Sequence, residues 1–169
     1  MGESAEQLEW RLMCEQDLAQ VNAVANIVHP DFFEDEVVFR DRLFTYPEGC
    51  FVLEHDNEIQ GYAISHPWPC DSVPVLNSVF GTLPESSDLY YIHDIALLPQ
   101  ARSGGQASRV VGMMVAHAER CNFRQMALVA VNNSQAFWER QGFRPVTVMA
   151  LTEKLKTYSD DAQYMVRKG

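Results

Sequence analysis

The chain has 169 residues, of which 47% are hydrophobic and 21% charged, and its formal net charge is −10. This length suits one domain with a sizeable core, so we expect residues 1–169 to form a single domain. The acidic surface repels phosphate backbones, which argues against nucleic-acid binding. The apolar runs are too short for a membrane span and the amino-terminal segment lacks a signal-peptide core, so we expect a cytoplasmic protein with no membrane partner.

The cysteine pattern argues against a metal centre. Cys14, Cys50, Cys70 and Cys121 form no close pair of the kind found in zinc sites or redox motifs. Three of the four lie in apolar periodic segments, which predicts buried, reduced thiols. We therefore expect no bound metal.

The first half of the chain predicts, in order, a strand, two helices and a β-hairpin: residues 10–13, 15–28, 34–46, 50–55 and 58–65. The first helix has apolar residues at helical spacing and stops at the His29-Pro30 step, because a residue before proline disfavours the helical conformation. Asp56-Asn57 is the expected two-residue turn of the hairpin. Residues 67–88 are rich in Pro, Ser, Asp and Gly and predict a long loop, either functional or poorly ordered.

The second half predicts strands that alternate with helices: strand 89–98, helix 106–121, strand 126–131, helix 134–141, and strands 143–151 and 162–168. Both faces of strand 89–98 are mostly apolar, which indicates a central strand covered on two sides. Helix 106–121 has the clearest helical spacing of apolar residues. The element order β-α-α-β-β-β-α-β-α-β-β predicts an α/β fold with a mixed sheet.

The segment QARSGGQASRVV, residues 100–111, joins strand 89–98 to helix 106–121. A helix start has backbone N–H groups without internal partners and carries the positive end of the helix dipole. Preceding glycines let a ligand approach those groups, so a diphosphate is the natural guest and Arg102 adds a cation. The alternative is a plain glycine turn, and this segment alone leaves both open. Neither the Walker pattern nor the dinucleotide fingerprint is present.

The segment IALLPQARSGGQASRVV resembles the acyl-CoA-binding signature of the GCN5-related N-acetyltransferases (GNAT), with Arg102, Gly105 and Ala107 in register. A second block, LVAVNNSQAFWERQGF, resembles the later strand and helix of that family, which end in an aromatic residue, three residues, Gly and Phe. Trp138 and the Gly-Phe pair at 142–143 supply that ending. The resemblance covers nearly the whole chain and implies the GNAT fold, a mixed, mainly antiparallel sheet flanked by helices.

The resemblance implies acetyl-CoA as co-substrate, in the gap where the strand before the loop splays from its neighbour. The implied contacts are strand backbone at Ile95, Ala96 and Leu97, and loop residues Arg102, Ser103, Gly104, Gly105, Gln106, Ala107 and Ser108. Arg102 is expected to be partly structural. Asn132 or Asn133 is expected to bind the pantetheine arm or to cap the following helix. We expect Phe137 to pack in the core and Trp138 to shape the wall beside the thioester.

Acyl transfer to an amine needs a base, because an amine near neutral pH is mostly protonated. We expect His93 to be this base, since it shares a predicted strand face with Ile95, although a buried core histidine is the alternative. Tyr91 shares that face and is expected to anchor a water chain, whereas Asp94 points to the opposite face, toward a cap or salt bridge. Many family members carry a tyrosine acid where Trp138 stands, and an indole cannot supply a proton.

The resemblance places the acceptor site at segments 29–36 and 67–88. The first combines Phe32 and Phe33 with carboxylates, which suits an amine, although a solvated acidic helix start explains it as well. We expect an N-acetyltransferase that acts on a primary amine of a small molecule, such as an amino acid or polyamine. The alternatives are a non-catalytic acyl-CoA sensor and a protein acetyltransferase for N-termini or lysines. Edge strands near the carboxyl terminus are compatible with a homodimer.

Overall fold

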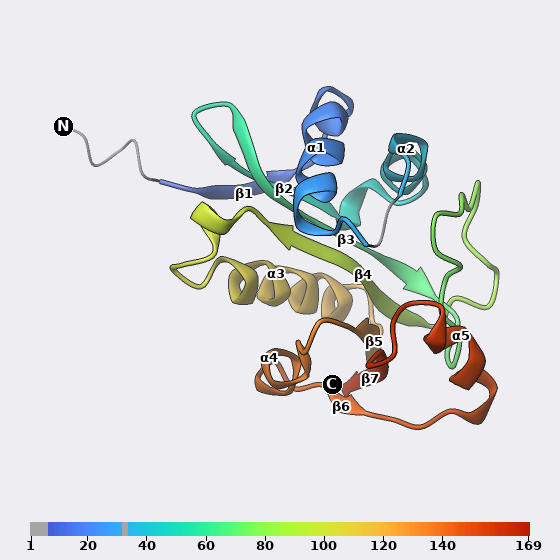
Figure 1. The fold of residues 1–169 in the computed structure, drawn as a ribbon. Helices are drawn as coiled ribbons and strands as arrows, with labels where there is room; N and C mark the ends of the chain where they lie inside the picture. Colours follow the sequence, from blue (N-terminus) through green and yellow to red (C-terminus); the bar gives the residue numbers. More distant parts are fainter. Residues whose placement is uncertain (1–6, 32–33) are drawn as a thin grey trace.

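The structure is a computed structural model that describes residues 7–31 and 34–169. Within these residues seven strands form one sheet, in the spatial order β1-β2-β3-β4-β5-β7-β6 (Figure 1). The strands are β1 (Glu9–Leu12), β2 (Cys50–His55), β3 (Glu58–Trp68), β4 (Leu89–Leu97), β5 (Gln125–Ala130), β6 (Arg144–Pro145) and β7 (Gln163–Lys168). Neighbours are antiparallel except β4 and β5, so the sheet is mixed and mainly antiparallel, as the sequence predicts.

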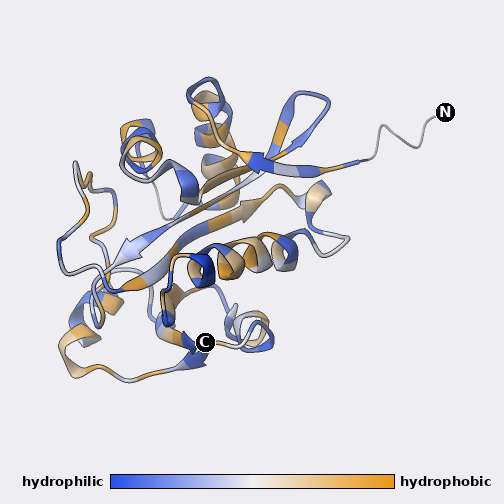
Figure 2. Ribbon diagram, turned by 180° about the vertical axis from the view of Figure 1, so that it is seen from behind, coloured by the Kyte–Doolittle hydropathy of each residue, from blue (hydrophilic) through white to orange (hydrophobic). Residues whose placement is uncertain are grey.

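The helices of the described residues flank this sheet: α1 (Leu18–Val28), α2 (Glu36–Thr45), α3 (Gln106–Arg120), α4 (Gln135–Arg140) and α5 (Thr152–Lys156). Helices α1 and α2 cover one face, and α3 and α4 the other (Figure 1). On α3 the buried residues Val110, Val111 and Met114 lie at helical spacing and belong to one cluster with Tyr90 and Ile92 of β4. Figure 2 shows hydrophobic and hydrophilic residues alternating along this helix. No helix in the described part combines the length and hydropathy needed to cross a membrane.

Strands β4 and β5 separate soon after they meet. Their parallel register covers only two pairs, Tyr90 with Met126 and Tyr91 with Ala127. Beyond Tyr91, β4 continues to Leu97 paired with β3 alone. The backbone of this part of β4 therefore has a free edge toward β5, and a gap opens between the two halves of the sheet.

The pairing of β3 with β4 is interrupted by a β-bulge. The register runs from Ile64 opposite Asp94 to Ser65 opposite Ile92. His93 is therefore an extra residue in β4, and the alternation of side chains breaks there. Asp94 contacts His29 of the α1 side and His93 contacts Glu34 before α2, whereas Ile95 packs in the cluster that contains α3. The prediction that His93 shares a face with Ile95 and that Asp94 faces the other way is wrong, because the bulge turns His93 and Asp94 to the same side.

Two further predictions need correction. Residues 143–151 do not form one strand: only Arg144–Pro145 pairs with β7, and a 3₁₀ turn at Met149–Leu151 leads into α5. One further hydrogen bond, from the Val146 N–H to the Tyr164 oxygen at 2.9 Å, follows this pairing, and Leu151 packs into a core cluster instead of extending the strand. Of the four cysteines only Cys50 is buried, because Cys14, Cys70 and Cys121 lie at exposed element ends or in loops. All four are free thiols.

Candidate active site

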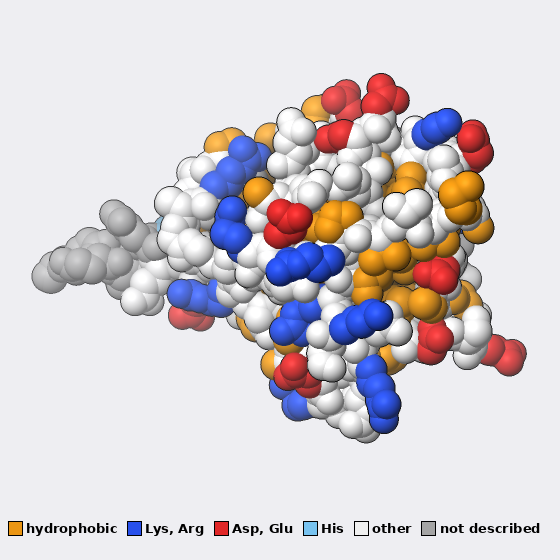
Figure 3. Space-filling view, turned by 90° about the horizontal axis from the view of Figure 1, so that it is seen from below, with side chains coloured by type: hydrophobic (Ala, Val, Ile, Leu, Met, Phe, Trp, Pro, Cys, Tyr) orange, Lys and Arg blue, Asp and Glu red, His pale blue; other side chains and the backbone are white. Residues whose placement is uncertain are grey.

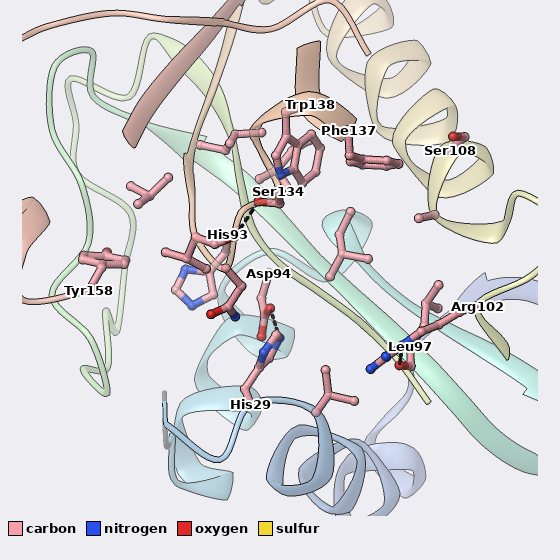
Figure 4. A pocket seen from close by; sticks show the side chains of 18 of the residues that line it. His29, His93, Asp94, Leu97, Arg102, Ser108, Ser134, Phe137, Trp138 and Tyr158 are labelled. Carbon is pink, nitrogen blue, oxygen red and sulfur yellow. Dashed lines mark hydrogen bonds and ion pairs between the residues drawn. The ribbon is translucent and has the colours of Figure 1, made fainter. Parts of the chain in front are cut away.

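A cavity of about 470 Å³ opens where β4 and β5 separate. Its walls come from β4, the start of α3, the loop between β5 and α4, and the end of α1. Figure 4 shows Arg102 and Ser108 at one end of this cavity and His93 and Tyr158 toward the other. A cleft of this volume with a few converging polar groups is the form that small-molecule sites take in proteins.

Most of the residues that the sequence predicts as cofactor contacts line this cavity: Ile95, Leu97, Arg102, Gly105, Gln106, Ala107, Ser108, Asn132 and Trp138. Both predicted catalytic residues, Tyr91 and His93, line it as well. Four predicted contacts do not: Ala96, Ser103, Gly104 and Asn133. The Ala96 side chain packs in the cluster that holds α1, and Ser103 and Gly104 lie exposed in the loop. Nine of the thirteen predicted cofactor contacts therefore meet at the cavity, and four lie outside its walls.

The start of α3 presents free backbone at the cavity. Gly104 and Gly105 have φ angles of +85° and +74°, and a side chain at either position would meet open space. No side chain caps this helix, so its first-turn amides stay available to a ligand and the helix dipole adds positive potential. The Nε–H of Arg102 donates to the backbone oxygen of Leu97 at 3.0 Å, which ties the loop to the end of β4. This arrangement suits a phosphate group.

The loop before α4 forms the facing wall. Asn132 and Asn133 have φ angles of +56° and +59°, a left-handed conformation that asparagine tolerates better than most residues. Neither caps α4, because the cap position belongs to Ser134, whose hydroxyl donates to the backbone oxygen of Val131. Trp138 is 9% exposed and makes edge-on contact with the ring of its neighbour Phe137, which packs against the same core cluster. The wall is thus aromatic and packed against the core.

A closed hydrogen-bond network lies at the end of α1. His29 Nε2 lies 2.9 Å from Asp94 Oδ1, and the Tyr62 hydroxyl donates to the other Asp94 oxygen. Burial disfavours the Asp94 carboxylate, but His29 and Tyr62 outweigh this and lower its pKa below the usual 3.8. Burial likewise opposes charge on His29, but Asp94 and a hydrogen bond to the Ile95 backbone raise its pKa above 6.5. His29 also follows the last residue of α1, where the helix dipole stabilises a cation.

His93 belongs to a second histidine–carboxylate pair. Its Nε2 lies 3.4 Å from Glu34 Oε1, and both side chains are nearly buried, at 6% and 7% exposed. The second Glu34 oxygen accepts the backbone N–H of Asn77 at 3.1 Å. Burial disfavours ionised Glu34, but His93 and this N–H lower its pKa below the usual 4.5. Glu34 therefore stays ionised at neutral pH although it is buried.

Tyr91 lies beside His93, with ring centroids 6.4 Å apart. It is 2% exposed and its hydroxyl is hydrogen-bonded to that of Tyr158, which in turn donates to the backbone oxygen of Pro74. Burial and these neighbours raise the pKa of Tyr91 well above 10. Tyr91 is therefore a neutral phenol that supports the wall under His93 and ties it to loop 67–88.

Sequence reasoning missed the individual roles of His29, Glu34 and Asn77. His29 was visible only as a helix-ending residue before proline, and Glu34 only as one of several carboxylates in segment 29–36. No sequence pattern pointed to Asn77, because its hydrogen bond is to Glu34, 43 residues earlier in the chain. Phe32 and Phe33, predicted as part of the acceptor site, lie outside the described residues. Among the described residues no group of three or more His, Cys, Asp or Glu could hold a metal ion.

Charge divides the molecule at this cavity. Residues 1–99 carry 3 Lys or Arg against 18 Asp or Glu, and residues 100–169 carry 10 against 5. The formal net charges of the two parts are therefore −15 and +5, which together give the −10 of the whole chain. The first part supplies β1 to β4 with α1 and α2, and the second supplies everything from α3 onward. Figure 3 shows several Lys and Arg side chains on the face seen from below.

Comparison with solved structures shows the same fold in several proteins. The loading GNATL domain of CurA from Lyngbya majuscula superposes with a TM-score of 0.75 at 14% identity, over 96% of this chain and 98% of that one. N-acetylglutamate synthase from Neisseria gonorrhoeae, complexed with coenzyme A and N-acetyl-glutamate, gives 0.68 at 16% identity, over 96% of this chain and 35% of that one. Arabidopsis thaliana Naa50, in complex with the bisubstrate analogue CoA-Ac-MVNAL, gives 0.69 at 14% identity, over 96% and 99%.

Comparison of the sequence with family models settles the family. No curated protein matches this chain. The model of the acetyltransferase (GNAT) family, in contrast, matches residues 10–143. This range contains all of β1 except its first residue, β2 to β5, the cavity-lining start of α3, and the loop and helix that carry Trp138. The chain therefore belongs to the acetyltransferase (GNAT) family.

Proposed function

We propose that this protein is an N-acetyltransferase that moves an acetyl group from acetyl-CoA to a primary amine of a small molecule. The observation that carries the proposal is one continuous cavity with two chemically different ends. Free amides at the start of α3 form one end. At the other end His29, His93 and Asp94 line the cavity, and they belong to two histidine–carboxylate pairs, His29–Asp94 and His93–Glu34. Such a cavity suits a donor with an anionic tail and an acceptor that arrives as a cation.

The donor end supports binding of acetyl-CoA. The amides from Gly105 to Ser108 are placed to hold the pyrophosphate, and Arg102 keeps the loop in position through its bond to Leu97. The free edge of β4 offers backbone groups to the pantetheine arm at Ile95 and Leu97. This course would bring the thioester beside Trp138 and Asp94, between the separated strands.

The chemistry requires one bond to form and one to break. The amine nitrogen attacks the acetyl carbon, a C–N bond forms, and the C–S electron pair leaves on sulfur. An acceptor that arrives as an ammonium loses two protons, of which one ends on the sulfur of CoA and the other reaches solvent. We propose His93 as the base that takes the proton from the amine. Thiolates leave well without an acid, so the absence of a tyrosine at position 138 does not block this step.

The acidic part of the molecule supports a small cationic acceptor. Residues 1–99, with their net charge of −15, supply His29, Leu76 and His93 at the acceptor end. Leu76 of loop 67–88 and Tyr158 line the cavity beside His93, and Tyr158 is bonded to Pro74 of the same loop. This loop limits the space for the acceptor, which favours a small amine over a peptide. A polyamine or a basic amino acid fits this charge best.

A non-catalytic acyl-CoA sensor is the second candidate, and Trp138 is the observation that favours it, because no proton donor replaces the usual tyrosine there. Thiol release from acetyl-CoA separates the two. We expect release with a diamine, weaker release with a neutral amino acid amide, and little with a dicarboxylic amino acid or a peptide with a free N-terminus. Binding of acetyl-CoA without release against any amine would favour the sensor.

We further propose that residues 1–169 form one catalytic domain that works in the cytoplasm. The single sheet of the described residues and the four free thiols support this, because disulfides are rare in reducing compartments. The short edge strand β6 leaves room for a second copy to add to the sheet, so we retain a homodimer as a proposal. Light scattering of the purified protein would give the mass that decides it.

A further inference from the structure

The two ring nitrogens of His93 differ in their contacts: Nε2 faces Glu34, and Nδ1 has no hydrogen-bond partner among the described residues. Its Nε2 faces the ionised Glu34 carboxylate at 3.4 Å, so Nε2 carries the hydrogen and Nδ1 holds the lone pair. Among residues 7–31 and 34–169, no hydrogen bond engages Nδ1. Because His93 also lines the cavity, Nδ1 is the nitrogen of this ring that is left for an acceptor amine.

The other histidine–carboxylate pair is a structural network. His29 Nε2 is bonded to Asp94, and the ring also bonds the Ile95 backbone. The two Asp94 oxygens are taken by His29 and Tyr62. These bonds join the end of α1 to the bulge and to β3, and they lower the pKa of Asp94 below 3.8, so its carboxylate is a weak base for a substrate proton. The two pairs thus look alike but differ in what they leave available.

The Glu34 carboxylate is itself fixed from a distant segment. Its second oxygen accepts the N–H of Asn77, and Asn77 Oδ1 accepts the backbone N–H of Asp35 at 2.8 Å. The Asn77 side-chain amide also donates to the Asp35 carboxylate at 3.2 Å. Asn77 has a φ of +53°, so its backbone is held in a conformation that few residues adopt. Loop 67–88 therefore sets the direction in which Glu34 points.

We propose that Glu34 is a positioning residue that holds His93 in the tautomer able to accept the amine proton, and that Asn77 fixes Glu34 for this task. The inference rests on the proposed function. When Nδ1 takes the proton, the imidazolium is stabilised by the Glu34 carboxylate, which itself gains no proton. Loop 67–88 would then contribute to the reaction through Asn77, although it supplies no reacting group.

The charged groups around His93 determine the expected pH dependence. Glu34 is the carboxylate that faces its ring, while the neighbouring Asp94 is neutralised by His29. The rings of His66 on β3 and Tyr91 on β4 lie 5.7 and 6.4 Å away, and both are neutral at pH 7, because burial lowers the pKa of His66 and raises that of Tyr91. Arg42 of α2 interacts electrostatically with Glu34 and forms an ion pair with Asp41. Glu34 is therefore the charge placed to stabilise an imidazolium formed at His93.

The test is the pH profile of kcat/KM for acetyl transfer to the best diamine, for wild type, Glu34→Gln and Glu15→Gln. Glu15 is an exposed carboxylate of the same acidic part, paired with Arg40. We expect Glu34→Gln to lower kcat by about 10- to 100-fold, with KM and acetyl-CoA affinity changed by less than about threefold. Its acidic limb should move to lower pH, and Glu15→Gln should match wild type.

Asn77→Gly is the second variant, because glycine keeps the N–H and accepts the positive φ but loses both contacts to Asp35. We expect an intermediate fall in kcat and the same direction of shift. If Glu34→Gln binds acetyl-CoA normally and lowers kcat with the acidic limb unmoved, Glu34 is merely structural and the inference is overturned. If wild type itself binds acetyl-CoA and turns over no amine, the proposed function fails first and the inference falls with it.

Discussion

The two ends of the cavity are built in different ways. The donor end is backbone: glycines with positive φ precede the free amides of α3 within one short segment. The acceptor end is side chain: His29, Glu34 and His93 come from the end of α1, the segment before α2 and the bulge of β4. A backbone site can be made by consecutive residues, whereas a buried side-chain site needs the whole topology. This difference explains why the donor end can be predicted from the sequence and the acceptor end cannot.

The largest effect is expected where the backbone end is blocked. A side chain at Gly105 meets open space, so Gly105→Asp should fold, but its carboxylate would face the pyrophosphate. We expect acetyl-CoA affinity to fall by at least about 100-fold, measured by calorimetric titration. Gly105→Asn has nearly the same size, tolerates the φ of +74° and carries no charge, and should lose less than about tenfold. Equal affinity in both variants would show that the segment is only a turn.

A substitution in the side-chain network of the acceptor end should change the stability of the protein. Asp94→Asn leaves His29 without its counter-charge, and we expect a loss of about 2 to 3 kcal/mol in the free energy of unfolding near pH 5.5. The pKa of Asp94 lies below 3.8, so its contribution is present above that pH and is lost as pH falls through the lower folded value. The pKa of His29 lies above 6.5, so its contribution is complete below pH 6.5 and is lost as pH rises through the higher folded value.

Urea unfolding of wild type and Asp94→Asn between pH 4 and 9 checks this window. The difference in stability between the two proteins should be widest from about pH 4 to pH 6.5 and should narrow on the alkaline side. A difference that stays constant above pH 6.5 would mean that His29 is not a charged partner of Asp94.

The charge division predicts a salt effect at the acceptor end of the cavity. Screening weakens attraction of the acidic part for a cationic amine. Between low and roughly physiological ionic strength, we expect KM for a diamine to rise by about three- to tenfold and KM for a zwitterionic amino acid to change less. Steady-state kinetics at matched pH measures both. A larger rise for the zwitterion would contradict a cationic acceptor.

The smallest effect is expected at the aromatic wall. Trp138→Phe keeps an aromatic ring against Phe137 and removes the indole N–H together with part of the bicyclic ring. Because indole supplies no proton in this pH range, kcat should change by less than about threefold. Thiol release under saturating substrates measures it. A fall of more than about tenfold would show that the indole N–H takes part in the reaction.

The sequence predicted most of the fold because its elements follow local patterns. Helix α3 forms where the apolar spacing of Val110, Val111 and Met114 places it, and the hairpin turns at Asp56-Asn57. The strand predicted over 143–151 failed because Leu151 packs into a core cluster instead of extending the strand. The spacing of apolar residues therefore predicts regular helices and strands, and it fails where tertiary packing determines the local structure.

The acceptor end could not be predicted in the same way. The bulge at His93 arises from the register between β3 and β4, and no residue of β4 marks it in the sequence. Glu34 and Asn77 meet across a loop whose course depends on its attachment to α2. The charge division can be counted in the sequence. Only the structure shows that the acidic and the basic part of the chain both line one cavity.

The most direct test is a crystal structure of the protein with CoA. The account predicts that the pyrophosphate oxygens accept hydrogen bonds from the amides between Gly105 and Ser108. It also predicts that the thiol lies between β4 and β5, near Trp138 and within reach of the His93 side. CoA bound elsewhere on the molecule, or a cavity that stays empty at saturating CoA, would contradict it.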